Sequence, residues 1–365
     1  MKPGQEITIS ADELVAGGDA LARVDGFPIF VSNIFPGDVA IVRLHEVKKG
    51  FARADLLRIV EPGPWRRADP CPIAEECGGC DWTALRLDRQ LEAKRRILTE
   101  SLRRIGKFDV ERLPSITIHP SPLNYRIRSR LHRDGDAVGF YAMGSNRVVP
   151  LSGECEVVGL RTRANVPEGE TWELDDQLIT GEREITIRVD DFSWTLSTES
   201  FFQVNRHLHG TMIRLVASHA ERCRARESAI DLYAGVGFFT LPLALRFRNV
   251  IAVEGSRESA AYARRNVPPN VRVIRAPVET HAARLRPADF VFLDPPRAGA
   301  RKEVVAAVAA LAREMICYLS CDPVTFARDA NRLIASGWRL STLDLLDLFP
   351  NTHHVETLAS FERAR

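Results

Sequence analysis

The sequence contains no apolar run that is long enough to form a membrane-spanning helix. Such a helix needs about 20 predominantly apolar residues, and no run in the 365 residues comes near that length. The opening stretch, MKPGQEITISADEL, also lacks the apolar core of a signal peptide. We therefore expect a cytoplasmic protein with no membrane partner.

A large net charge is also missing. The formal net charge is +2, so overall composition does not by itself indicate a nucleic-acid-binding protein. The charges are unevenly distributed, however, because residues 61–133 contain 15 Lys+Arg and only 10 Asp+Glu. A local excess of positive charge suits a polyanionic partner.

Internal repeats and low-complexity segments are absent, and the length predicts two or three domains. There are seven cysteines. In a chain of this size in a reducing compartment, cysteines are better explained as metal ligands, a nucleophile and packing residues than as disulfides.

Residues 1–60 alternate short β-rich stretches with turns that contain glycine or proline. The stretches are QEITIS, DALARV, FPIFV, GDVAIVRL and ADLLRIV. Five short strands in about sixty residues predict a small OB-like β-barrel, a fold that often binds nucleic acid. A barrel that serves only as a structural lid is the alternative.

Residues 61–180 form a second predicted region, which opens with the linker EPGPW and a group of cysteines. The segment LRLDRQLEAKRRILTESLRRIG predicts a basic helix. Farther on, YRIRSRLHR alternates like a strand and places Arg126, Arg128 and Arg130 on one face. This stripe suits phosphate groups, and a solvated edge strand explains it equally well.

Residues 181–365 change in pattern. From about Ser228, apolar runs such as AIDLYAG, NVIAVEG, ADFVFLDPP and MICYLSC alternate with helical segments. Continuous apolar strands separated by helices predict an α/β fold with a doubly wound parallel sheet covered on both faces. The last two runs, WRLSTLDLLDLF and VETLASFER, lie close together and predict an antiparallel pair at one edge.

A glycine turn follows the first of these strands, in DLYAGVGFF. Gly235 and Gly237 let the backbone approach a ligand closely, although the third glycine of a dinucleotide fingerprint is missing. The next strand ends at Glu254, whose carboxylate could accept both hydroxyls of a ribose. Together these residues favour a nucleoside-bearing cofactor over a purely structural turn.

Two further strands end in reactive groups. Asp294 follows the run FVFL and precedes two prolines, which stop the strand and stiffen the turn. Cys321 comes just after the apolar run MICYL, whereas a cysteine kept for packing would lie inside the strand, as Cys317 does. Cys317 and Cys223 are both expected to be packing residues.

Cys71, Cys77 and Cys80 form a C-x5-C-x2-C run, CPIAEECGGC, in which two glycines allow the chain to fold tightly around a metal. Cys155 is the candidate for a fourth ligand. Three cysteines plus one distant cysteine suit an iron–sulfur cluster, and zinc is the rival.

Taken together, the glycine turn, Glu254, DPPR, SCDP, SFFQVN at 200–205 and the late FPNTHHVE resemble the S-adenosylmethionine-dependent RNA uracil-5-methyltransferases. One departure is SCDP, where many members have SCNP; the cysteine is retained. The resemblance implies a class I methyltransferase domain at 181–365, an OB-like TRAM domain that binds RNA at 1–60, and a small cluster-binding middle domain at 61–180.

The resemblance also implies roles for individual residues. Cys321 would be the nucleophile that adds to C6 of uracil, and Glu356 the base that removes the C5 proton. The cofactor-binding residues would be Gln203, Tyr233, Gly235, Gly237, Glu254 and Asp294, the last holding either uracil or the cofactor's amino-acid end. A [4Fe-4S] cluster rather than zinc would be held by Cys71, Cys77, Cys80 and Cys155.

The expected product is 5-methyluridine, in 23S ribosomal RNA because the barrel and the cluster together resemble members that act there. Transfer RNA is the alternative substrate. An amino-group methyltransferase, which needs no thiol, and a non-catalytic RNA-binding protein are rivals from other classes. We expect the protein to act as a monomer.

Overall fold

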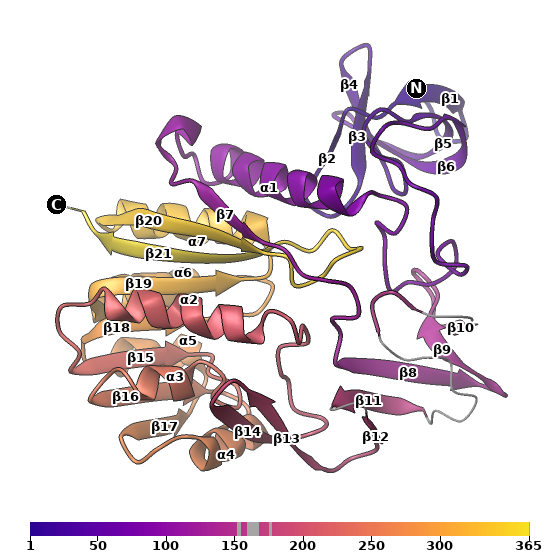
Figure 1. Ribbon diagram of the computed structural model, residues 1–365. Helices are drawn as coiled ribbons and strands as arrows, with labels where there is room; N and C mark the ends of the chain where they lie inside the picture. Colours follow the sequence, from indigo (N-terminus) through magenta and orange to yellow (C-terminus); the bar gives the residue numbers. More distant parts are fainter. Residues whose placement is uncertain (152–154, 159–167, 175–176, 365) are drawn as a thin grey trace. The chain divides into compact units, whose positions relative to one another are not determined.

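The computed structural model describes residues 1–151, 155–158, 168–174 and 177–364. The chain divides into two compact units, each assembled from separated stretches (Figure 1). The first unit comprises residues 1–99, 131–168 and 349–354, and the second comprises residues 100–130, 169–348 and 355–365. Among the described residues, none of the helices has both the length and the apolar character that crossing a membrane requires.

The first unit begins with a curled six-stranded sheet. Its strands are β1 (Glu6–Ser10), β2 (Glu13–Leu14), β3 (Ala20–Val24), β4 (Phe27–Val31), β5 (Val39–Val47) and β6 (Ala52–Glu61). They are hydrogen-bonded in the order β1-β5-β6-β4-β3-β2, and the sheet bends until β1 contacts β3. All five stretches predicted from the sequence form strands, and the barrel-like fold is confirmed.

A long helix, α1 (Leu87–Arg104), follows the barrel where the basic helix is predicted. Ile97, Leu98 and Leu102 are buried on one side of it. Two polar residues of α1, Gln90 and Lys94, are also fully buried. Strand β8 (Arg128–Asp134) begins in the second unit and continues into the first from Leu131, and β9 (Ala137–Tyr141) and β10 (Val148–Pro150) lie in the first unit.

The second unit is built on an eight-stranded sheet in the order β17-β16-β15-β18-β19-β21-β20-β7. Its strands are β7 (Ile116–His119), β15 (Ser228–Leu232), β16 (Asn249–Glu254), β17 (Val271–Arg275), β18 (Ala288–Leu293), β19 (Ala312–Ser320), β20 (Trp338–Leu346) and β21 (Glu356–Arg363). Strands β15 to β19 are parallel to one another, and β21 runs antiparallel to β19 and β20. The predicted antiparallel pair is present, but β7 lies outside it and forms that edge.

Helices cover both faces of this sheet, as the alternating pattern predicts (Figure 1). Helices α2 and α3 contact each other on the face nearer the viewer, and α6 and α7 contact each other behind it. The helices are α2 (His209–Glu221), α3 (Thr240–Ala244), α4 (Arg257–Asn266), α5 (Val278–His281), α6 (Lys302–Leu311) and α7 (Pro323–Ala335), with short 3-10 turns at Val110–Arg112 and Ala282–Arg284. Two hairpins, β11 (Gly169–Leu174) with β12 (Gln177–Thr180) and β13 (Glu184–Val189) with β14 (Phe192–Ser197), precede α2.

Buried Asp329 connects α7 to β19 and to the turn before α6. Its Oδ2 accepts hydrogen bonds from the Tyr318 hydroxyl at 3.0 Å and from the Ala300 backbone N–H at 2.9 Å. Its Oδ1 accepts from Arg328 and Arg332, each at 2.9 Å. Removing one partner of a buried ion pair typically lowers the free energy of unfolding by about 3–5 kcal/mol. This carboxylate therefore helps to fix the end of β19, directly before Cys321.

The basic strand near Arg128 is partly structural. Its alternation is as predicted, because Tyr125, Ile127 and Leu131 are buried between the arginines. However, Arg128 donates to Glu170 at 2.7 Å and to the Ser200 carbonyl at 2.8 Å, so its guanidinium is already bound within the second unit. The side chain of Arg130 is 63% exposed although it lies 3.3 Å from Glu170.

Candidate active site

Five strands of the second unit bring functional side chains to the edge at which the parallel strands end, here called the carboxyl edge. Ligands of open α/β sheets bind at this edge. The side chains lie at or just beyond the strand ends: Asp231 in β15, Glu254 at the end of β16, Asp294 after β18, Cys321 after β19 and Glu356 at the start of β21. Because β21 is antiparallel, its first residue reaches the same edge as the last residues of its neighbours.

Cys321 lies between the end of β19 and the start of α7. Asp322 caps the helix by accepting the N–H groups of Val324 and Thr325, and Pro323 fits the first turn. The thiol therefore follows a fully buried strand and precedes a helix N-terminus, as the sequence predicts. Cys317 is buried within β19, which confirms the contrast between the two cysteines.

Burial, followed by the negative charges of Glu356 and Asp294, raises the pKa of the Cys321 thiol to about 12. Arg297 acts in the opposite direction, but its effect is smaller. A cysteine thiol with an ordinary pKa is partly ionised near pH 7, and the Cys321 thiol of the free protein differs in this respect. Desolvation and two acidic neighbours outweigh the helix N-terminus, which alone would favour the thiolate.

The two acidic neighbours are themselves shifted. Burial, followed by the charge of Asp294, raises the pKa of Glu356 well above its usual value. Burial, followed by the charge of Asp231, raises the pKa of Asp294 to about 8. A carboxyl group with a raised pKa is suited to exchange protons near neutral pH.

The glycine turn after β15 has the backbone that the sequence predicts. Gly235 and Gly237 have φ angles of +55° and +91°, and Tyr233 between the strand and the turn is also left-handed at +64°. A Cβ added at Gly235 would meet open space. Strain in a non-glycine residue is frequently found at functional sites, so Tyr233 and Gly235 mark a surface that a ligand can approach.

Glu254 stabilises this turn directly. Its Oε2 accepts the Gly235 N–H at 2.8 Å, and its Oε1 accepts the Ser256 N–H at 2.6 Å. Each oxygen retains a second acceptor site for a ligand hydroxyl. The Tyr233 hydroxyl donates a hydrogen bond to Glu279 at 3.0 Å. Burial, followed by this contact with Glu279, raises the pKa of Tyr233.

The side chain of Gln203 contacts Asp294. Its amide nitrogen donates to Asp294 Oδ2 at 3.4 Å, and its backbone carbonyl lies 2.6 Å from His209 Nε2. Burial lowers the pKa of His209 to about 4, so this histidine is a neutral support. The structure thus brings Gln203 and Asp294 together, and their roles remain predictions.

Sequence reasoning missed Asp231 and Arg297. Burial raises the pKa of Asp231 to about 7, although its Oδ2 accepts a hydrogen bond from Thr240. Its other carboxylate oxygen finds no partner among the described residues. The sequence signal for Asp231 was an aspartate near the end of an apolar strand, the same feature that identified Asp294.

The carboxyl edge is therefore acidic and poorly solvated. Asp231, Asp294 and Glu356 each raise the pKa of another group there. A positively charged ligand would relieve this repulsion, because an opposite charge favours the ionised carboxylate. S-adenosylmethionine, the cofactor expected from the sequence, carries positive charge on both a sulfonium and an ammonium group.

The four predicted metal ligands lie in the first unit. Burial and the neighbouring thiols Cys155, Cys77 and Cys71 raise the pKa of Cys80, which places the four sulfurs within electrostatic range of one another. The Gly79 N–H donates to Cys77 Sγ at 3.4 Å. In the part of the chain that is described, no group of three or more His, Cys, Asp or Glu is arranged to hold a metal ion.

Cys223 and Cys317 are the two remaining cysteines, and both are buried. Burial raises the pKa of Cys223 to about 12 and that of Cys317 well above its usual value. Their prediction as packing residues agrees with this burial.

Two parts of the chain match described protein families. Residues 2–57 match the TRAM domain, and residues 167–364 match the family described as tRNA (Uracil-5-)-methyltransferase. The second match covers more than half of the chain and includes the entire carboxyl edge described above.

Relatives match over nearly the full length. An RNA methyltransferase of Gloeobacter violaceus is 30% identical over 99% of this chain and 97% of its own length. The 23S rRNA (uracil(1939)-C(5))-methyltransferase RlmD of Edwardsiella ictaluri is 30% identical over 98% of this chain and 96% of its own. The crystal structure of Pyrococcus abyssi tRNA (uracil-54, C5)-methyltransferase in complex with S-adenosyl-L-homocysteine is similar with a TM-score of 0.74 and 25% identity, covering 97% and 99% of the two chains.

The fold, the acidic carboxyl edge and these matches define an S-adenosylmethionine-dependent RNA methyltransferase. The chain belongs to the tRNA (uracil-5-)-methyltransferase family, and its activity class is that of RNA uracil-C5 methylation. The family resemblance seen in the sequence is confirmed, as is the TRAM domain at the N-terminal end.

The raised pKa of Cys321 predicts slow alkylation of the free protein. With the thiol pKa at about 12, the thiolate fraction should rise about tenfold per pH unit from about pH 7 to about pH 9. Iodoacetamide labelling, followed by mass spectrometry of the peptide that contains Cys321, measures this rate without RNA or cofactor. An unstructured cysteine peptide is the control, and a plateau for Cys321 below about pH 9 would contradict the burial argument.

Proposed function

We propose that this protein forms 5-methyluridine in 23S ribosomal RNA by adding Cys321 to C6 of uracil and transferring the methyl group of S-adenosylmethionine to C5. The observation that supports the mechanism most directly is the clustering of Cys321, Glu356 and Asp294, because each of the last two affects the pKa of the thiol. A nucleophile and a base must both reach one pyrimidine ring, and this clustering meets that requirement.

The chemistry explains why a thiol is needed. C5 of uracil is too weak a nucleophile to displace a methyl group from a sulfonium. Formation of a bond between the Cys321 sulfur and C6 makes an enolate, and its C5 attacks the methyl carbon while the S–CH3 bond breaks to give S-adenosylhomocysteine. Glu356 then takes the C5 proton, the S–C6 bond breaks, and the thiolate is released.

The thiol must lose its proton to solvent before the first step. Its raised pKa in the free protein means that a bound cation is required to favour the thiolate, and the sulfonium supplies that charge in the complex. Arg297 adds a positive charge on the protein side. We infer that the site becomes reactive only when the cofactor is bound.

The remaining site residues would hold the cofactor. Glu254 would accept its ribose hydroxyls, and Gly235 and Gly237 would let it approach the backbone. Gln203 and Asp294, which already contact each other, would bind its amino-acid end or the uracil. Tyr233 would line the pocket.

Ribosomal RNA is proposed because relatives named 23S rRNA methyltransferases align over nearly the entire chain. The likeness to a tRNA methyltransferase from Pyrococcus abyssi keeps transfer RNA as the second candidate. The TRAM barrel and residues such as exposed Arg130 would contact the RNA backbone. The protein would act as a cytoplasmic monomer.

We also propose that Cys71, Cys77, Cys80 and Cys155 hold a [4Fe-4S] cluster. The type of donor fits, because four thiolates are the usual ligands of such a cluster, and the Cys80 thiol is affected by the charges of Cys155, Cys77 and Cys71. The methyl transfer needs no electron transfer, so the cluster's contribution would be structural, joining the loop that carries Cys71, Cys77 and Cys80 to Cys155.

Two substitutions should separate the nucleophile from the base. Cys321→Ala should abolish both methylation and the covalent RNA complex, a loss of several orders of magnitude, while S-adenosylmethionine binding stays close to wild type. Glu356→Gln should trap the methylated covalent complex, because loss of a general base costs about 10²- to 10⁴-fold in turnover. Denaturing gels with labelled methyl groups measure both species.

Cys223→Ala is the matched control, since it removes a thiol outside the site and should preserve the covalent complex. If Cys321→Ala retained methylation, an amino-group methyltransferase would be favoured. If Glu356→Gln released product at the wild-type rate, Glu356 would not be the base.

A deletion strain should identify the substrate. We expect 23S rRNA from that strain to lack one 5-methyluridine while its tRNA is unchanged, as measured by nuclease mapping and mass spectrometry. Restoration by the wild-type gene and not by Cys321→Ala is the control. Loss of the modification from tRNA alone would overturn the ribosomal assignment.

Anaerobically purified protein should be brown and contain about four irons per chain. Cys155→Ser should lower the iron content and the visible absorbance, whereas Cys223→Ser should leave both unchanged. Metal analysis and absorption spectroscopy provide the readout. A colourless protein that contains stoichiometric zinc would refute the cluster.

A further inference from the structure

A six-residue segment between β20 and β21 belongs to the first unit. The chain leaves the second unit after Leu348, and residues 349–354 pack in the first unit before the chain returns at Val355. Glu356, the proposed base, comes two residues after this segment. Its backbone pairs with Leu346 of β20, so the segment is the loop of the hairpin that presents the base.

Asn351 anchors the segment through all of its polar groups. It is fully buried with φ at +64°. Its N–H donates to Gln90 Oε1 at 2.7 Å, and its side-chain oxygen accepts from Gln90 Nε2 at 3.0 Å. Its side-chain nitrogen donates to Glu156 at 3.1 Å, and its carbonyl accepts the N–H groups of Asp81 and Trp82.

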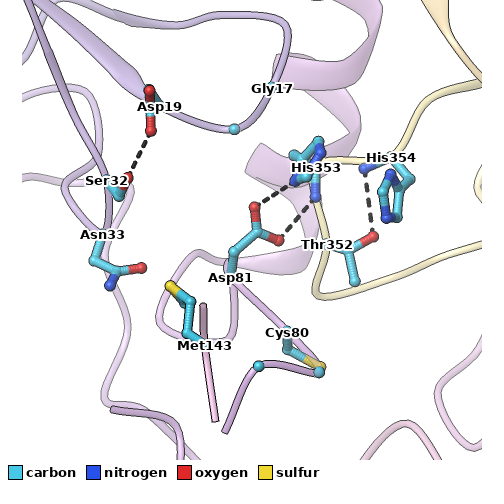
Figure 2. Close-up of a pocket in the computed structure, with 13 residues that line it drawn as sticks. Gly17, Asp19, Ser32, Asn33, Cys80, Asp81, Met143, Thr352, His353 and His354 are labelled. Atoms are coloured by element: carbon cyan, nitrogen blue, oxygen red, sulfur yellow. Dashed lines mark hydrogen bonds and ion pairs between the residues drawn. The ribbon is translucent and has the colours of Figure 1, made fainter. Parts of the chain in front are cut away.

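Asp81 fixes the next part of the segment. One oxygen of its carboxylate accepts the His353 backbone N–H at 3.0 Å, and the other lies 2.6 Å from Nδ1 of the same residue. Figure 2 shows both contacts on one wall of a pocket of about 260 Å³. Asp81 directly follows Cys80. The segment 71–81, here called the cysteine loop, therefore makes both of these contacts with His353.

Close packing leaves this attachment little freedom. A Cβ added at Gly18, in the turn before β3, would lie 2.5 Å from Asp81 Oδ2 and 3.0 Å from His353 Cβ. The same Gly18 accepts a hydrogen bond from the Trp82 indole at 3.2 Å. Lys94 of α1 donates to the Phe349 carbonyl at 2.9 Å, so both ends of the segment are held.

The start of the loop is fixed separately within the second unit. Asn205, which is fully buried, donates to the Leu348 carbonyl at 2.9 Å. Residues 349–354 are thus held in the first unit and are joined through Val355 to Glu356 at the start of β21. A small displacement of a catalytic group is costly, since misplacement by about 1 Å can cost about a hundredfold in rate.

We propose that Asp81 is a positioning residue for Glu356, so that the cysteine loop controls removal of the C5 proton through the segment 349–354. The inference rests on the proposed function of Glu356 as the base. It assigns Asp81 no contact with RNA or cofactor, and predicts that the residue affects one step of the reaction.

The test compares single-turnover steps with 23S rRNA transcribed in vitro and S-adenosylmethionine carrying a labelled methyl group. Asp81→Ala should slow resolution of the covalent complex by about ten- to a hundredfold, while methyl transfer to the RNA stays close to the wild-type rate. Asp81→Asn retains an acceptor for the His353 N–H and should restore most of the resolution rate. His353→Ala, which leaves the cysteine loop sequence intact, should slow the same step less than Asp81→Ala does.

Asp190→Ala is the matched control, because it removes an exposed aspartate paired with Arg214 at 3.3 Å and should change neither step. Equal loss of methyl transfer and resolution in both the Asp81→Ala and His353→Ala variants would show a general structural or RNA-binding role and overturn the proposal, as would no change in either. If Glu356→Gln trapped no covalent complex, the proposed role of Glu356 as the base would fail. If Glu356→Gln trapped the complex but Asp81→Ala resolved it at the wild-type rate, only the inference about Asp81 would be refuted.

Discussion

Burial of several acidic groups at one edge of a sheet is the constraint on which the site depends. Cys321, Glu356 and Asp294 are shielded from solvent, and a negative charge on one of these acidic groups makes ionisation of its neighbour less favourable. In the free protein, burial therefore raises the pKa of all three groups. A bound sulfonium would reverse this balance, so we propose that cofactor binding and activation of the thiol are one event.

Strand direction is what assembles these groups. The parallel strands β15, β16, β18 and β19 deliver their last residues to the same edge, and antiparallel β21 adds its first residue. The hairpin loop before β21 belongs to the unit that contains the cysteines. Glu356, the proposed base, is thus two residues from a segment that packs in the first unit, and this is why we propose a positioning role for Asp81.

Patterns confined to one stretch of sequence could be predicted. Apolar runs that end in Asp294 or Cys321 predicted the strands and their edge, and the glycine turn at Gly235 has the expected backbone. Properties that depend on distant residues could not. The pKa of Cys321 depends on Glu356, Arg128 is bound by Glu170, and His353 contacts Asp81 across 272 positions; no local pattern encodes such pairs.

The central claim is that the sulfur of Cys321 bonds to C6 of the target uracil. RNA in which that uridine is replaced by 5-fluorouridine tests it most directly, because fluorine at C5 cannot be removed as a proton and the covalent complex persists. Digestion and mass spectrometry should find the nucleotide attached to the peptide that contains Cys321. Absence of the adduct, or its attachment to another residue, would contradict the account.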